Sequence, residues 1–440
     1  MIPPMSRTVA LAPHLRRVGL VIATADLAII AFATLLPEPG AAVGSHFCLL
    51  CGPLGGVNSV LNIFLFVPLG IGLALSGFSG KRAVIAMCAL SALIETAQLI
   101  VIPGRYSTIG DVLTNSLGGA LGFAIGRYAL ILLRPSPRIA LALTMGWSAL
   151  WLATQAISAY GFSPAIPKSQ YFGQIAPCLG NLEQFRGAVV RASIANVTVP
   201  DTRFPDSHRV RELLLRGAIV TTTIVPARRT SGIAPIVRVA DTREREILLL
   251  AQDTDNLVFG VRTGAAVFRL RPPAFALPDA FPAVSPSDSA LTTDTLTVSA
   301  RYSAREVWVN AQARTSYDRR IPITASLAWT MLLPFQWFIA GTRTELVVSA
   351  IWIACLLFPI GYWLRGVVRF PQAHDAARIR MTAVSIALML LYVGLVIVPR
   401  TFGVTAATPS EWLAALTGIL SGAALAPRVS EPDTKVVQTD

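Results

Sequence analysis

Long apolar stretches occupy both ends of the chain, and a more polar region with short alternating segments separates them. Five stretches in the first part are long enough to cross a bilayer as helices: 18–36, 59–77, 83–102, 112–132 and 139–157. Four more follow in the last part, the fourth weaker than the others: 322–340, 346–364, 379–399 and 411–427. The first stretch has no convincing cleavage pattern, so we expect it to remain as an anchor. The pattern predicts a multi-pass membrane protein.

The middle region, about residues 160–321, has the pattern of a folded β-domain instead. Prolines and charges are frequent in it, and it has no apolar run long enough to cross a membrane. Alternating stretches rich in β-branched residues predict strands at 218–225, 236–240, 245–251, 257–262, 266–270, 296–302 and 306–310. Several short strands at this spacing favour an antiparallel β-sandwich.

These patterns divide the chain into four parts and give the fold class. We expect a polytopic all-α transmembrane bundle into which an extracytoplasmic antiparallel β-sandwich is inserted. The parts are a five-span bundle, the sandwich, a C-terminal transmembrane region of three or four spans, and a disordered tail: 1–158, 159–321, 322–428 and 429–440.

Composition excludes an ordinary cytosolic enzyme. The 440 residues are 53% hydrophobic and only 14% charged, whereas soluble domains are about a quarter charged. A chain this apolar cannot cover its own surface with polar side chains, so lipid is part of its solvent. The formal net charge of +13 comes almost entirely from arginine. We expect these arginines to set the orientation and to contact membrane lipids, and we expect no nucleic-acid partner.

Positive charges in the short loops predict the orientation. Basic residues precede the first span and follow the second and the fourth: Arg7, Arg16, Arg17, Lys81, Arg82, Arg134 and Arg138. The loop 37–57 after the first span has no lysine or arginine. By the positive-inside rule the N-terminus is cytoplasmic, and residues 159–321 lie outside a bacterial cytoplasmic membrane.

The number of spans depends on residues 322–340. Nine spans put the loop 365–380, which contains four arginines, on the outside, against the positive-inside rule. If 322–340, which contains Pro334 and Gln336, is interfacial or re-entrant, the count is eight and that loop is cytoplasmic. Length alone leads us to expect nine spans, whereas charge favours eight.

Polar side chains within the first apolar region recur at helical spacing. Residues three or four positions apart share one face of a helix. Such pairs are Asn58 and Asn62, Glu95 and Gln98, and Asp111 and Asn115. Arg105 lies in the short turn between the last two pairs, and Asp26 is a further acid within the first span. Polar groups at membrane depth are costly and usually face a bundle interior, so we expect the pairs to converge near the outer membrane surface.

In order and spacing these residues resemble the VanZ-like family of membrane proteins. The segments, over about residues 20–130, are Asn62-Ile-Phe-Leu-Phe-Val-Pro-Leu-Gly70, Glu95-Thr-Ala-Gln98, Gly104-Arg105 and Asp111-Val-Leu-Thr-Asn115-Ser-Leu-Gly118. One member of that family is linked to low-level teicoplanin resistance, so the resemblance implies a cell-envelope role connected with glycopeptide tolerance. The family's polar positions correspond to Asn62, Glu95, Gln98, Arg105, Asp111 and Asn115.

Three functions stay open for this polar cluster. It can be an interhelical network in which Arg105 pairs with Asp111 or Glu95, or it can bind a polar headgroup whose anion Arg105 holds. The candidate ligand-binding residues are Asn62, Gln98, Arg105 and Asn115. It can also be catalytic, with Glu95 and Asp111 as general acid and base. The cluster has no histidine and no metal-ligand spacing, so we expect no metal there.

Cys48 and Cys51 form a C-x-x-C motif in the predicted first outer loop. One nearby histidine does not complete a zinc site, which needs four ligands. In an oxidising compartment a local disulfide is the simpler prediction, and a redox role is the alternative.

The middle region resembles, more faintly, laminin-G and concanavalin A-like sandwiches over about residues 210–315. The segments are Ile236-Val-Arg-Val-Ala-Asp241, Ile247-Leu-Leu-Leu-Ala-Gln-Asp253-Thr-Asp-Asn-Leu-Val-Phe259 and Val307-Trp-Val-Asn310. The resemblance implies a jelly-roll that binds glycans, in some members with Ca²⁺. Trp308 is then a sugar-stacking platform or, equally, a core residue. Asp253 and Asp255 are calcium ligands or, as is commoner for such a sequence, part of a hairpin turn.

We therefore expect a bacterial cell-envelope membrane protein that binds an envelope glycan or a lipid-linked headgroup. Whether it is an enzyme stays open. The first alternative is an intramembrane enzyme that acts on a lipid-linked envelope substrate with Glu95 and Asp111. The second is a membrane scaffold without a ligand, in which the polar cluster only holds helices together.

Overall fold

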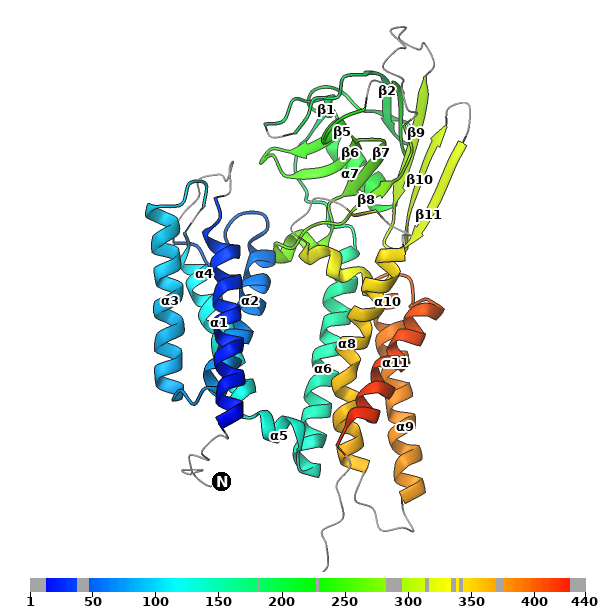
Figure 1. Ribbon diagram of the computed structural model, residues 1–440. Coiled ribbons are helices and arrows are strands. Elements are labelled where there is room, and N and C mark those ends of the chain that lie inside the picture. Colours follow the sequence, from blue (N-terminus) through cyan, green and yellow to red (C-terminus); the bar gives the residue numbers. More distant parts are fainter. Residues whose placement is uncertain are drawn as a thin grey trace, which may run out of the picture.

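Helices and strands occupy separate parts of the molecule, with the sheets beyond one end of the helices (Figure 1). The computed structural model describes residues 13–37, 47–105, 107–180, 182–226, 229–281, 295–312, 316–333, 338–339, 343–368 and 376–427. The tail predicted at 429–440 and Arg369 of the basic loop lie outside the described residues. The predicted combination of an apolar helical part and a separate antiparallel β-sheet part is confirmed.

The predicted spans of the first part are helical. They are α1 (Pro13–Leu35), α2 (Gly55–Leu75), α3 (Gly80–Ile100), α4 (Ile109–Arg127) and α6 (Pro137–Phe162). The stretch 112–132, expected to be one span, is divided because the backbone leaves the helical conformation at Tyr128. The short helix α5 (Ala129–Leu133) follows and joins α4 to α6 at the end opposite the sheets (Figure 1).

Helices α2 and α4 pack with their backbones in contact, because glycines lie where the two helices meet. A Cβ atom at Gly118 would overlap the carbonyl oxygen of Ile63, and one at Gly122 would overlap that of Val67. Gly70 of α2 faces the backbone of α4 in the same way. Small residues allow this approach between membrane helices, whose association depends on close packing rather than on the exclusion of water.

A second helical group consists of α6 and the helices that follow the sheets. These are α8 (Arg343–Val368), α9 (Ala376–Tyr392), the π-helix η3 (Val393–Ile397), α10 (Val398–Thr401) and α11 (Pro409–Leu425). Trp151 of α6 is fully buried in one apolar cluster with Leu357 and Leu391. In the described part of the chain, six helical segments are long and apolar enough to cross a membrane: α1, α2, α3, α6, α8 and the continuous helix 377–401.

The β-region forms two six-stranded sheets. One has the order β1-β5-β6-β7-β8-β12, and the other has the order β11-β10-β9-β4-β2-β3. Strand pairs are antiparallel except that β12 runs parallel to β8. The strands are β1 (Tyr171–Ile175), β2 (Ala188–Ile194), β3 (Val197–Thr198), β4 (Val220–Val225), β5 (Ile233–Asp241), β6 (Glu246–Asp253), β7 (Asn256–Val261), β8 (Ala274–Leu277), β9 (Leu296–Tyr302), β10 (Glu306–Gln312), β11 (Ser316–Pro322) and β12 (Phe338–Ile339). Helix α7 (Ser207–Leu215) precedes β4.

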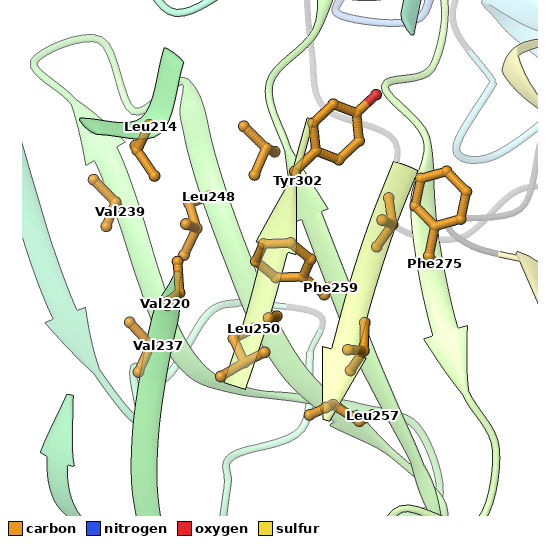
Figure 2. Packing of buried hydrophobic residues seen from close by; sticks show 14 of the residues in the cluster. Leu214, Val220, Val237, Val239, Leu248, Leu250, Leu257, Phe259, Phe275 and Tyr302 are labelled. Atoms are coloured by element: carbon orange, nitrogen blue, oxygen red, sulfur yellow. The ribbon is translucent and has the colours of Figure 1, made fainter. Parts of the chain in front are cut away.

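One apolar core joins the two sheets (Figure 2). Along β9 every second residue is buried and the residues between are half-exposed, so the period-two pattern marks the inner face of the sheet. Val237, Leu248 and Phe259 contribute to this core from the other sheet. The hydroxyl of Tyr302 donates to the carbonyl of Phe162 at 2.7 Å, which ties the core to the last residue of α6.

The prediction of a span at 322–340 is wrong. The segment contains the end of β11, the 3-10 helix η2 (Ala325–Leu332) and β12. Leu327, Ala328 and Met331 of η2 are buried in the core of the β-region, which explains why this segment is as apolar as a span. Hydropathy measures removal from water, and it does not distinguish lipid from the interior of a protein.

The prediction of a strand at 266–270 is also wrong. These residues belong mainly to the 3-10 helix η1 (Gly264–Phe268), in which Val267 and Phe268 are exposed. The ring of Phe268 packs edge-on against Tyr160 of α6, with the ring centroids 5.7 Å apart. The segment is therefore apolar because it contacts the helices. The strands that were not predicted lie at the sheet edges, where polar residues are common, or next to an edge: β1, β3, β11 and β12, and β2 and β8.

We predict that Gly122→Val separates α2 from α4, because the added side chain meets the carbonyl of Val67. Overpacking of this kind costs about 1–3 kcal/mol. Thermal unfolding in detergent should show a lower midpoint and a lower folded yield. Gly146→Ala in α6 is the matched control, because a Cβ atom there has nothing within 4 Å. Equal midpoints for the two variants would contradict the assigned helix contact.

Candidate functional site

The polar cluster predicted from the sequence centres on Thr108, a residue that the sequence analysis did not select. Thr108 precedes α4, and its hydroxyl oxygen accepts a hydrogen bond from the backbone N–H of Asp111 at 3.0 Å. The same hydroxyl donates to Oδ2 of Asp111 at 2.7 Å. Asn62 of α2 donates from Nδ2 to the other oxygen of Asp111, also at 2.7 Å. Both carboxylate oxygens of Asp111 are therefore hydrogen-bonded.

Glu95 of α3 joins the same cluster through the backbone of Thr108. The N–H of Thr108 donates to Oε2 of Glu95 at 2.9 Å, and Glu95 is buried. One residue thus holds two carboxylates that come from different helices. A threonine three positions before an acidic residue at a helix start is a capping signal, so the sequence Thr108-Ile-Gly-Asp111 contained the information needed to find it.

Gln98 and Arg105 bind the end of α1 rather than the two carboxylates. Nε2 of Gln98 donates to the carbonyl of Thr34 at 2.9 Å. Arg105 donates to the carbonyls of Ala33 and Leu36 at 2.9 and 3.0 Å. The last four carbonyls of a helix have no partner within that helix, so these side chains cap α1. The structure assigns Arg105 a helix-capping contact in addition to any role in binding an anion.

Asn115 and Asp26 lie deeper among the helices than the Thr108 cluster. Asn115 donates from Nδ2 to the hydroxyl of Ser91 at 3.0 Å, and its buried Oδ1 has no hydrogen-bond partner among the described residues. Asp26 accepts from the backbone N–H of Leu69 at 2.7 Å. Each of these contacts joins two helices at a separate point, so the structure distributes the predicted polar residues over four small groups.

Cys48 and Cys51 are joined by a disulfide, with their Cα atoms 5.6 Å apart. The loop that contains them touches the Thr108 cluster, since the N–H of Gly110 donates to the carbonyl of Cys48 at 3.1 Å. Gly110 has no room for a side chain, because a Cβ atom would overlap the carbonyl of Leu49. The disulfide loop is therefore packed directly against the start of α4.

The predicted ligand residues of the β-region lie apart from this cluster. Trp308 of β10 is half-exposed and faces away from the core, because the alternate residues Val307 and Val309 are the buried ones. Its indole N–H donates to Asp318 of the neighbouring strand. The alternative of a core tryptophan is therefore wrong.

The segment Asp253–Asn256 is a hairpin turn between β6 and β7. Oδ2 of Asp255 lies 3.1 Å from Nε of Arg229. Within the described residues no group of three or more His, Cys, Asp or Glu side chains could hold a metal ion. Calcium binding by Asp253 and Asp255 stays a prediction.

Residues 18–133 match the family model described as VanZ/LLP1. This range contains most of α1, the whole of α2, α3 and α4, and the whole Thr108 cluster, so the VanZ-like part of the sequence prediction is supported. No curated protein and no solved structure matches the chain. The helices of residues 18–133 are thus VanZ-like and of membrane type, and the β-region has no counterpart in these comparisons.

We predict that Thr108→Val destabilises the helices around the cluster, whereas Thr108→Ser does not. Valine removes the helix cap and leaves one oxygen of Asp111 without its hydroxyl donor. Together these losses are expected to lower the free energy of unfolding by about 1–3 kcal/mol. Serine retains the hydroxyl, and both variants retain the N–H that binds Glu95. Thermal unfolding in detergent measures the difference, and equal midpoints would argue against Thr108 as the centre of the cluster.

Proposed function

We propose that this VanZ-like membrane protein acts in the bacterial cell envelope and binds a lipid-linked headgroup or an envelope glycan where its helices meet its β-region. The segment 48–56 carries the proposal because it is bonded to both parts. The carbonyl of Cys48 binds Gly110 beside the Thr108 cluster, and the N–H of Gly56 donates to the carbonyl of Arg269 in the β-region at 3.1 Å. A ligand at this junction would be contacted by both parts at once.

The position of the junction favours a ligand that is attached to the membrane. The junction lies at the helix ends that face the sheets (Figure 1), so a headgroup anchored in the bilayer would reach it without leaving the membrane surface. Trp308, which belongs to the β11-β10-β9-β4-β2-β3 sheet, offers a half-exposed aromatic surface on which a sugar can stack. Binding of a lipid-linked envelope precursor would connect this chain with the glycopeptide tolerance that its VanZ resemblance implies.

This proposal uses eight spans: α1, α2, α3, α4, α6, α8, the helix from α9 to α10, and α11. The end of α8 and the start of α9 lie at the same end of the bundle as the start of α1, opposite the sheets (Figure 1). Arg365, Arg378 and Arg380 occupy these two helix ends. With the β-region outside, these arginines are cytoplasmic, in agreement with the positive-inside rule.

Labelling with a membrane-impermeant maleimide tests this orientation in spheroplasts. Cys178, an exposed cysteine of the β-region, should react in intact spheroplasts, and Cys178→Ser should abolish that signal. In the Cys178→Ser background, Arg378→Cys should react only after permeabilisation. Labelling of Arg378→Cys in intact spheroplasts would overturn the eight-span orientation.

A scaffold without a ligand is the second candidate, and one observation favours it. Both oxygens of Asp111 are already hydrogen-bonded within the protein, so stability alone is sufficient to explain Asp111. Catalysis by Glu95 and Asp111 is the third candidate, because both carboxylates meet at Thr108. The three candidates predict different effects of removing these carboxylates on protein level, ligand binding and the envelope profile.

Comparison of envelope lipids and glycans separates the three candidates. A deletion strain would be complemented at matched membrane levels with the wild type, with Glu95→Gln/Asp111→Asn, or with the control Gly146→Ala. We predict that deletion changes the abundance of one lipid-linked species or glycan, and that the wild type and the control restore it. If the double variant is present in the membrane at the wild-type level and still binds the ligand, but does not restore the lipid or glycan profile, the result would favour the enzyme. An unchanged profile in the deletion strain would favour the scaffold and reject the proposal.

A further inference from the structure

A cavity of about 940 Å³ lies between the outer face of the β1-β5-β6-β7-β8-β12 sheet and the loop that precedes α2. Ile233, Leu249, Val258 and Ala274 supply an apolar floor, and the first three are buried members of a small cluster on this face. Gly52, Pro53 and Leu54 close the side that faces the VanZ-like helices. The sequence analysis assigned none of the lining residues to a binding or catalytic site.

Arginine dominates the polar lining of the cavity. The charged residues are Arg243, Glu244, Arg245, Glu246, Arg262, Arg269 and Arg271. Both glutamates already face Arg238, which lies behind the lining, at 3.0 and 3.7 Å. Arg245 binds Asp241 at 2.7 Å. In the described part of the chain the guanidinium group of neither Arg243 nor Arg262 has a carboxylate oxygen within 4.0 Å, so the cavity has an excess of positive charge.

This positive charge is partly shielded from water. Burial lowers the pKa of the Arg262 guanidinium, and the neighbouring Arg245 lowers it further. Burial also lowers the pKa of Arg271. An anion beside these groups would replace lost hydration and relieve the repulsion between the two neighbouring guanidinium groups.

The cavity lies where the helices end. Arg269 directly follows η1, and Arg271 lies two residues further on. Helix η1 is packed against Tyr160 at the end of α6 and against Gly56 at the start of α2. The exposed side chains of Val267 and Phe268 lie on the same short helix. Apolar side chains followed at once by arginines are typical of the boundary between hydrocarbon and headgroups.

We infer that this cavity binds the phosphate of a membrane lipid headgroup, with the apolar floor receiving the group that the phosphate carries. The guanidinium fork matches phosphate oxygens in pairs, which an ammonium group does not. The volume lies in the range of small-molecule sites, at about 300–1,000 Å³, and exceeds what a lone phosphate ion needs. This inference rests on the proposed function and narrows its ligand class to phosphate-bearing lipids.

Native mass spectrometry of the full-length protein in detergent tests the inference with three probes: dihexanoyl phosphatidic acid, dihexanoylglycerol and inorganic phosphate. We expect the wild type to retain phosphatidic acid and to bind the neutral lipid at least about tenfold more weakly. If the wild type retains both lipids equally, the inference is overturned, and no variant is needed for that conclusion. If inorganic phosphate binds as tightly as phosphatidic acid, the ligand is a free anion, and the assignment to a membrane lipid is wrong.

Charge removal locates the site. Arg243→Gln/Arg262→Gln should weaken phosphatidic acid binding at least about tenfold. The matched control Arg191→Gln/Arg320→Gln, which removes two exposed charges from the other sheet, should bind as the wild type does. Equal binding by both double variants would overturn the assignment of the cavity. Thermal unfolding of each variant shows that the compared proteins are folded.

The readouts for the inference and for the proposed function are independent. Phosphatidic acid binding that depends on the arginines, combined with an unchanged envelope profile in the deletion strain, would support the cavity and reject the envelope role. A changed profile without such binding would reject the cavity and leave the proposed function in place.

Discussion

Two carboxylates from different helices depend on one threonine. The hydroxyl of Thr108 caps α4 and binds Asp111, and its N–H binds Glu95. Ionisable groups close to the hydrocarbon are costly unless they are hydrogen-bonded, so the positions of α3 and α4 follow from the need to satisfy these two side chains. The glycines along α4 then let α2 approach closely enough for Asn62 to reach Asp111.

The same local arrangement extends to the β-region. The disulfide loop rests on Gly110, one residue before Asp111, and it continues to Gly56, which is bonded to Arg269. A second bond links the sheets to the other helical group: the hydroxyl of Tyr302 in β9 donates to the carbonyl of Phe162, the last residue of α6. The sheets are therefore held by bonds to both helical groups, and the arginine-lined cavity lies at one of these two attachments.

Much of this arrangement could be predicted from the sequence, and the failures have physical causes. Strong periodicity located the helices of both groups and the central strands, because burial on one face leaves a repeating pattern. The segment 322–340 was wrongly taken for a span because Leu327 and Met331 are buried in a protein core, which hydropathy cannot distinguish from lipid. Glu95, Asp111 and Asn62 were correctly expected to converge.

The contact of Arg105 with the end of α1 could not be predicted, because loop conformation decides where a long side chain reaches. The arginine cavity was missed for a similar reason. Its residues are scattered over turns and strand ends between Arg243 and Arg271, so no spacing rule groups them, and only the folded sheet brings them to one side.

Photo-crosslinking measures most directly whether a phosphate-bearing lipid occupies the junction of helices and sheets. The full-length protein would be placed in nanodiscs with a phosphatidic acid analogue that carries a photoreactive group next to its phosphate, and modified peptides would be identified by mass spectrometry. The account predicts crosslinks in 52–54 and in 243–271, which line the cavity from its two sides. Crosslinks confined to the lipid-facing helices, with none in these two segments, would contradict it.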